Sequence, residues 1–271
     1  MALLHRIGKK VFFGRFQKKW RWPADVPQDG WERVQFKAHN GARLSAVFGA
    51  AQGGQASGAV VLAHPMGVAA KGFWLKHGHA DLLRRNGFDV LAFDFNGFGE
   101  SESADFDYPG DAVAAGEYLR ERVGHDAIGL VASSFGAGYG LCAMEREGHP
   151  YRAAVLEAAF PSLPYYWRQY RVPSVLLRAS QVVYPRFERR LRPIRAAAEL
   201  KSRPSVLLIH GDADQVSPVS VGTQLRDAIG QRAAVDLWIV PGAQHTLAFA
   251  AQKDDYEKRV TDFLRRSLGN Q

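Results

Sequence analysis

The sequence predicts an α/β fold, in which a mostly parallel central sheet carries helices on both faces. Short, continuous apolar runs, typical of strands buried on both sides, recur along the chain, and helical patterns separate them. Strands that alternate with helices favour a parallel sheet. The length of 271 residues, with 46% hydrophobic and 23% charged residues, suits one larger α/β domain with an inserted segment. The apolar runs are 59–63, 89–93, 128–133, 153–157, 205–209 and 235–240.

An antiparallel hairpin is expected before the first of these runs. Residues 32–37 and 42–48 alternate between apolar and polar side chains, and the turn signal His39-Asn40-Gly41 separates them. Helical patterns follow at about 73–86, at 109–123 and at 256–268. A further helix is expected directly after the serine turn that is described below. Together these elements predict a core formed by residues 31–159 and 202–271.

Two segments lie outside this alternation. Residues 1–30 are predicted to form a basic amphipathic arm, which either lies at a membrane interface or packs on the parent domain with solvated lysines. Residues 160–201 contain several prolines, many aromatic residues and a cluster of arginines. We expect this stretch to form a small helical cap, or lid, over the carboxyl end of the sheet, where open α/β sheets bind ligands.

The net charge of +8 is unevenly distributed, because the arm and the cap are basic and the remaining body is acidic. A basic surface favours anionic partners, such as an acidic carrier protein or an anionic membrane. Nucleic acid is not expected, because the aromatic spacing of a binding module is absent. With a single cysteine, no secretory signal and no run long enough to span a membrane, we expect a cytoplasmic protein, with peripheral attachment to a membrane as the alternative.

The stretch 128–138 predicts a strand, a tight turn and a helix with a serine at the apex. A nucleophile in such a turn needs small residues two positions before and two positions after it. Ser134 has Ala132 and Gly136 at these positions, whereas Ser133 has Val131 and Phe135. Ser134 is therefore the predicted nucleophile.

A serine hydroxyl needs a base, and the base needs a carboxylate to orient it. Downstream of Ser134, the loop His210-Gly211-Asp212-Ala213-Asp214 follows one strand, and Pro241-Gly242-Ala243-Gln244-His245 follows the next. With the order Ser, Asp, His at successive strand ends, residues 32–268 resemble the α/β-hydrolase superfamily.

The resemblance implies that Ser134 is the nucleophile, Asp214 the orienting acid and His245 the general base. Asp214 has a turn cap as its alternative role, and Asp212 and His210 are expected to be structural. The resemblance also implies an oxyanion hole made by the backbone amides of Phe135 and Met66. His64 would brace that loop, and the turn 94–101, in which Asn96 replaces the family's usual arginine, is expected to be structural.

These features predict a serine hydrolase of the esterase and lipase type, which cleaves a carboxylic ester with an apolar or lipid-like acyl group through an acyl-enzyme on Ser134. Tyr165, Trp167 and Tyr170 of the cap are the predicted substrate contacts. Alternatives are a thioesterase or acyltransferase that takes acyl groups from a carrier protein or coenzyme A, and a non-catalytic membrane-associated scaffold. No metal-ligand cluster or phosphate-binding glycine loop is present, so no metal or cofactor is expected.

Overall fold

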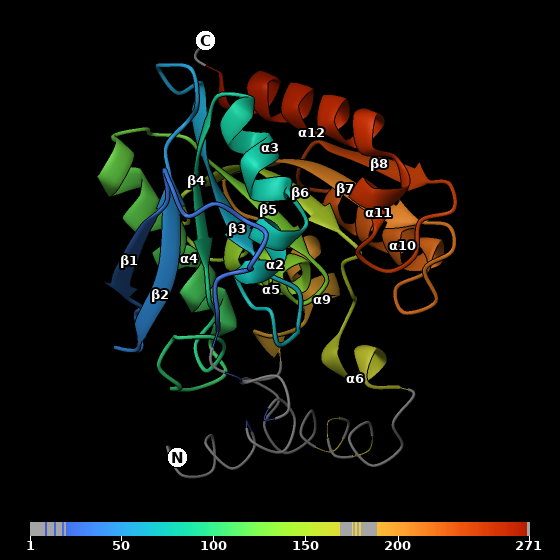
Figure 1. The fold of residues 1–271 in the computed structure, drawn as a ribbon. Helices are drawn as coiled ribbons and strands as arrows, with labels where there is room; N and C mark the ends of the chain where they lie inside the picture. The colour runs from blue at the N-terminus through green and yellow to red at the C-terminus, as the bar shows by residue number, and fades with distance from the viewer. Residues whose placement is uncertain are drawn as a thin grey trace.

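The central sheet has eight strands among the residues that the computed structural model describes, namely 9, 14, 18, 20–168, 175, 177, 179 and 189–269. The strand order is β1-β2-β4-β3-β5-β6-β7-β8 (Figure 1). The hairpin β1–β2 and the pair β2–β4 are antiparallel, and every other pair is parallel. The predicted fold class is confirmed. The strands are β1 (Glu32–Lys37), β2 (Arg43–Gly49), β3 (Gly58–Ala63), β4 (Phe88–Phe93), β5 (Ile128–Ser133), β6 (Tyr151–Glu157), β7 (Ser205–Gly211) and β8 (Val235–Val240).

Helices cover both faces of the sheet, and each face has its own apolar core. Alternate residues of one strand point to opposite faces. On β3, accordingly, Val61 packs with one cluster, whereas Val60 and Leu62 pack with the other. The first cluster includes α4 (Tyr108–Val123), α5 (Phe135–Met144), α9 (Pro193–Ala197) and α10 (Val219–Ile229). The second includes α2 (Gly72–Lys76), α3 (His79–Arg85), α11 (Ala248–Ala251) and α12 (Lys253–Leu268).

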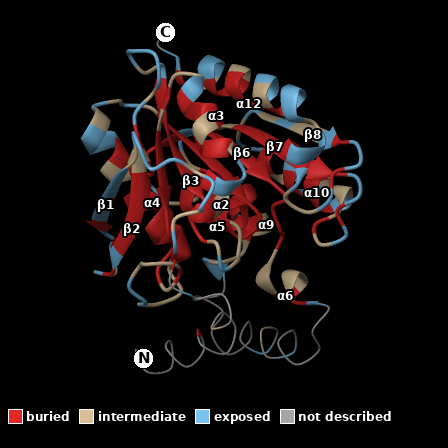
Figure 2. Cartoon of the chain, in the orientation of Figure 1, coloured by how far each residue is buried: buried red, intermediate tan, exposed pale blue. Residues whose placement is uncertain are grey.

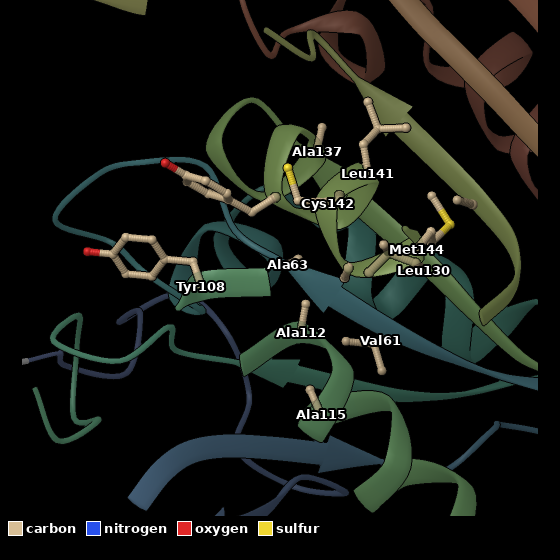
Figure 3. Close-up of a cluster of buried hydrophobic side chains, with 14 of the residues drawn as sticks. Val61, Ala63, Tyr108, Ala112, Ala115, Leu130, Ala137, Leu141, Cys142 and Met144 are labelled. Carbon is tan, nitrogen blue, oxygen red and sulfur yellow. The ribbon is translucent and has the colours of Figure 1, made fainter. Parts of the chain in front are cut away.

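The middle of the sheet is almost completely buried, as the red strands in Figure 2 show. On the face of α4 and α5, small residues let the helices lie close to the strands. Figure 3 shows Ala112 and Ala115 of α4 beside Val61 of β3, and Met144 of α5 beside Leu130 of β5. This packing fixes the helix that begins directly after the predicted nucleophile.

Two helices differ from the sequence prediction. The helix expected at 73–86 is two helices, α2 and α3, because Gly78 has φ 79°, a left-handed conformation that a helix interior does not accept. Helix α12 begins at Lys253 rather than at Tyr256. Its first turn carries Asp254 and Asp255, which interact well with a helix N-terminus but give no apolar signal.

The predicted arm falls mostly outside the described residues, since only Lys9, Gly14 and Lys18 are described before Trp20. Lys9 is buried and donates from Nζ to the backbone oxygen of Asn96 at 3.1 Å. Trp20 is also buried and lies over Lys71, with 4.2 Å between the ammonium and the ring centroid. Among the described helices, none combines the length and the hydrophobicity that a membrane span requires.

Candidate active site

Ser134 lies between β5 and α5, in a strained turn with φ 49° and ψ −107°. Its backbone amide donates to the oxygen of Glu157 on β6 at 2.8 Å, which fixes the turn to the neighbouring strand. A Cβ atom on Gly136 would lie 2.1 Å from the backbone oxygen of Ala63. The first turn of α5 therefore lies so close to the end of β3 that only glycine fits at position 136.

Asp214 lies in the loop after β7, and its side chain is fully buried. One carboxylate oxygen accepts the backbone amides of Val216 and Ser217 at 2.8 and 2.9 Å. The turn-cap role that the sequence left open is thus present, while the other oxygen faces His245. His210 contacts the backbone oxygen of Ser217 through Nδ1, and Asp212 accepts the amide of Gly242.

His245 joins the other two residues. Its Nδ1 lies 2.8 Å from Oδ2 of Asp214, and its Nε2 lies 2.9 Å from Oγ of Ser134. The loops that carry acid and base meet closely, because a Cβ on Gly211 would lie 2.0 Å from the backbone oxygen of Ala243. The imidazole side chain is 23% exposed, so substrate has access to the base, whereas the Asp214 carboxylate is shielded from solvent.

This arrangement can activate a hydroxyl. When Nδ1–H donates to Asp214, the lone pair of Nε2 faces the proton of Ser134 Oγ. The buried carboxylate also stabilises the imidazolium that forms when His245 takes that proton. The three residues come from the ends of β5, β7 and β8, on one edge of the sheet.

The two residues predicted to provide oxyanion amides follow the neighbouring strands β5 and β3. Phe135 is the first residue of α5, where backbone amides point out of the helix N-terminus. Met66 is half-buried in the loop after β3. His64 stabilises that loop, because its Nδ1 contacts the oxygen of Pro65 at 2.8 Å and its Nε2 accepts the amide of Phe95 at 3.2 Å. Burial lowers the pKa of His64, which is consistent with a neutral, structural imidazole.

A buried ion cluster joins the same loop to the turn after β4. The ammonium of Lys71 lies 2.5 Å from Oδ2 of Asp94, 2.9 Å from Oε2 of Glu100 and 3.2 Å from the hydroxyl of Ser45. Neither Lys71 nor Asp94 reaches solvent. This group, which we call the Lys71 cluster, fixes the loop after β3 to the turn after β4.

Asn96, in the turn after β4, has a structural role. Its amide and side-chain nitrogen both donate to Oδ2 of Asp111, at 2.8 and 2.6 Å. Lys9 also donates to the Asn96 side chain, which brings a cation of the arm close to Asp111. A positive charge is therefore present here although Asn96 stands where the family usually has arginine. Burial is the main cause that raises the pKa of Asp111, to about 7.

The cap residues are partly described. Helix α6 (Leu163–Tyr166) follows β6, and α9 packs on the core. Arg168 attaches the end of α6 to the acid loop by donating to the backbone oxygens of Gln215 and Val216 at 3.1 and 3.2 Å. Tyr165 is half-buried with its ring 3.9 Å from the Arg168 guanidinium, and Trp167 is buried in the core. Tyr170 lies outside the described residues, and substrate contact by these three aromatics stays a prediction.

Sequence reasoning overlooked Glu157. This carboxylic acid ends β6, is 3% exposed, and interacts electrostatically with His245 and Asp214. An acidic residue at the end of an otherwise apolar, fully buried strand was the signal that could have identified it. Among the described residues, no group of three or more histidine, cysteine, aspartate or glutamate side chains could hold a metal ion.

Comparisons with known proteins assign this chain to a family. The sequence profile of the prolyl oligopeptidase family, Peptidase_S9, matches residues 82–271. The human Protein ABHD12B is 29% identical over 192 residues, which cover 61% of this chain and 50% of that protein. The chain thus spans about half the length of this curated relative.

Solved structures show the same fold at low identity. Esterase Pf2001 of Pyrococcus furiosus superposes with a TM-score of 0.74 at 19% identity, over 92% of this chain and 96% of that chain. The esterase domain of a Rhodothermus marinus protein gives 0.64 at 19% identity, over 88% and 99% of the two chains. The chain belongs to the prolyl oligopeptidase family and has the α/β-hydrolase fold.

Proposed function

We propose that the protein is a serine hydrolase that cleaves carboxylic esters through an acyl-enzyme on Ser134. One observation carries the proposal: a single imidazole, that of His245, lies within hydrogen-bond distance of both the Ser134 hydroxyl and the buried Asp214 carboxylate. A hydroxyl on a strained turn, a base and an orienting acid are the parts that acyl transfer requires.

In the proposed reaction, His245 takes the proton of Ser134 while Oγ attacks the ester carbonyl. The negative charge that develops on the carbonyl oxygen would be stabilised by the backbone amides of Phe135 and Met66. The tetrahedral intermediate collapses to the acyl-enzyme, and His245 gives its proton to the leaving alcohol. A water molecule, activated by the same base, then attacks the acyl-enzyme and releases the acid and free Ser134.

Exposed apolar residues beside the site support an apolar acyl group as substrate. Val68, two residues after Met66, is 52% exposed, and Leu247, two residues after His245, is 38% exposed. Their exposed aliphatic surface, next to site residues in the sequence, would be available for an apolar acyl group to bury. The name of Esterase Pf2001, whose fold this chain shares, agrees with ester hydrolysis.

Replacement of the nucleophile tests the proposal. Ser134→Ala should lower the turnover of p-nitrophenyl acyl esters by at least about 1,000-fold and abolish labelling by a fluorophosphonate. Ser133→Ala is the matched control, since Ser133 is buried directly before the turn and should not be needed for turnover. Full turnover by Ser134→Ala would contradict the proposal. A comparison of oxygen esters, thioesters and peptide anilides on the wild-type protein would define the bond that is cleaved.

A second candidate is a thioesterase or acyltransferase that receives its acyl group from an acidic carrier protein. The exposed Arg189 and Arg190 of the predicted cap favour it, because surface cations can steer an acidic partner toward the protein. We expect activity on carrier-bound acyl groups to fall with ionic strength if this candidate is right. Activity that is independent of salt would contradict it.

A further inference from the structure

Glu157 contacts the candidate site through both its backbone and its side chain. As the last residue of β6, it pairs with Ser133 of β5 and with Ile209 of β7 (Figure 1). Its backbone oxygen accepts the amide of Ser134 at 2.8 Å. Glu157 therefore holds the backbone of the nucleophile turn and also carries a carboxylic acid at the same place.

The side chain reaches the segment that follows the base. Oε1 accepts the backbone amide of Ala248, the first residue of α11, at 2.9 Å. Between His245 and Ala248 lie only Thr246, which has φ 61°, and Leu247. A strained link this short transmits the position of Ala248 to the imidazole.

The second oxygen of this acid, Oε2, is buried and has no hydrogen-bond partner among the described residues. The titratable groups that face it come from three directions: Asp214 in the loop after β7, His245 in the loop after β8, and Tyr256 of α12. His210 of β7 interacts in turn with Asp214 and His245. A negative charge on Glu157 would thus lie beside an existing carboxylate and a base, in an apolar setting.

We propose that Glu157 is a positioning residue for His245, which acts through Ala248, and that the loss of its proton adds a second negative charge to the triad. The inference rests on the proposed function for its catalytic consequence. Burial is the largest effect on the acid and raises its pKa to about 7, while the Ala248 amide and His245 oppose the rise and Asp214 adds to it. Glu157 is therefore uncharged at mildly acidic pH and ionises near neutrality. Since a nearby anion favours a positive charge, ionised Glu157 would stabilise the imidazolium that His245 forms during the reaction.

Two substitutions separate the two parts of the inference. Glu157→Gln keeps an acceptor for the Ala248 amide but cannot ionise, whereas Glu157→Ala removes the acceptor as well. We expect Glu157→Ala to lower kcat by about 10- to 100-fold with little change in KM, because a displaced base slows acylation more than binding. Glu157→Gln should restore kcat and shift the acidic limb of the pH profile of kcat/KM by about half a unit to lower pH.

Asp111→Asn is the matched control. Asp111 is likewise a buried acid that accepts a backbone amide and whose pKa is raised to about 7, but it lies in the turn network of Asn96. Asp111→Asn should leave kcat and the position of the pH profile unchanged. The inference is overturned if Glu157→Ala keeps wild-type kcat, or if Glu157→Gln shifts the profile no more than Asp111→Asn does.

A measurement without substrate keeps this test apart from that of the proposed function. The imidazole proton resonance of His245, titrated by NMR, should move to lower pH in Glu157→Gln relative to the wild type. If Ser134→Ala retained turnover, the proposed function would fail, while this titration would still decide whether Glu157 and His245 are coupled. An unchanged His245 titration curve would overturn the inference even in an active esterase.

Discussion

At the scale of single residues, Asp214 orients the base and also holds its own loop. Oδ1 is occupied by the amides of Val216 and Ser217, so only Oδ2 remains for His245. The two amide hydrogen bonds keep the carboxylate from rotating. The proton on Nδ1 of His245 therefore has a single acceptor, Oδ2. The orientation of the Asp214 carboxylate thus comes from local backbone hydrogen bonds.

Asp214→Asn should lower kcat by about 1,000- to 10,000-fold and leave the fold intact. The amide oxygen of asparagine can still accept Val216 and Ser217, but its NH2 group would then face His245. The imidazole would turn to the tautomer whose Nε2 carries a proton and cannot accept that of Ser134. Steady-state kinetics on a p-nitrophenyl ester would measure the loss.

Asp212→Asn is the control for this substitution, because Asp212 accepts a backbone amide of the base loop without touching the base. It should retain turnover. Asp214→Asn with more than about a tenth of wild-type kcat would contradict the assigned role of the acid.

A second prediction concerns the glycine in the serine turn. In Gly136→Ala, the new methyl group would overlap the backbone oxygen of Ala63, and backbone cannot move aside as a flexible side chain can. We expect a loss of about 2–3 kcal/mol in the free energy of unfolding, and greatly reduced turnover. Urea unfolding monitored by tryptophan fluorescence would measure the first quantity.

Gly58→Ala at the start of β3 is the comparison, because its nearest atoms, in Leu268, lie at an ordinary 3.4 Å. It should change the free energy of unfolding by less than about 1 kcal/mol. Equal effects of the two substitutions would show that the close approach of α5 to β3 does not restrict position 136.

At the scale of elements, the loops after β3 and β4 depend on the Lys71 cluster. Lys71→Met should lower the free energy of unfolding by about 3–5 kcal/mol, because Asp94 would be left as a buried, unpaired charge. Urea denaturation at neutral pH would measure this. The double variant Lys71→Met/Asp94→Asn has no unpaired buried charge at position 94, so it should regain a good part of the lost stability. A loss below about 1 kcal/mol in the single variant would show that the pair contributes little.

Elements that follow from local patterns were predictable from the sequence. Apolar runs such as 59–63 and 205–209 indicated the buried strands, and the small residues Ala132 and Gly136 distinguished Ser134 from Ser133. The order of the three polar residues at strand ends predicted that they would meet at one edge of the sheet. The structure places His245 within hydrogen-bond distance of both Ser134 and Asp214.

Features that depend on tertiary contacts were not predictable. The contacts of Lys71 and Glu157 could not be predicted, since their partners are distant in the sequence and only the folded sheet brings them together. The break at Gly78 was missed because the apolar spacing continues through it on both sides. The first turn of α12 was missed because polar residues occupy it.

At the scale of the whole molecule, two sets of buried groups make stability depend on pH in opposite directions. Burial is the main cause that raises the pKa of Asp111 and Glu157 to about 7, from 3.8 and 4.5. The folded state then holds protons that the unfolded state has lost, so these acids contribute stability that declines as pH rises from about 4 to 7. The buried histidines His64, His79 and His210, whose pKa is lowered by burial, act in the opposite sense: they lower stability as pH falls below 6.5.

His79 should dominate the acidic side of this balance. It is buried among Phe73, Trp74, Phe249 and Tyr256, and neither ring nitrogen has a partner among the described residues. Burial, with a smaller contribution from His77, lowers its pKa from 6.5 to about 3. Below pH 6.5 the unfolded chain therefore binds a proton that the folded state refuses. This one residue should cost about 2–3 kcal/mol between pH 7.5 and 4.5.

His79→Phe places an uncharged ring in this aromatic setting and should remove that cost. We expect the free energy of unfolding in urea to fall less between pH 7.5 and 4.5 in His79→Phe than in the wild type, by about 2–3 kcal/mol. His79→Leu is a second uncharged variant with a smaller side chain. If the phenylalanine ring packs poorly and lowers stability at both pH values, His79→Leu should still show the same reduced pH dependence. Asp111→Asn should change the curve with the opposite sign, because it removes stability that is present only at low pH. If the wild type and both His79 variants lose equal stability on acidification, then His79 accepts a proton inside the folded protein and the second core is more polar than its side chains indicate.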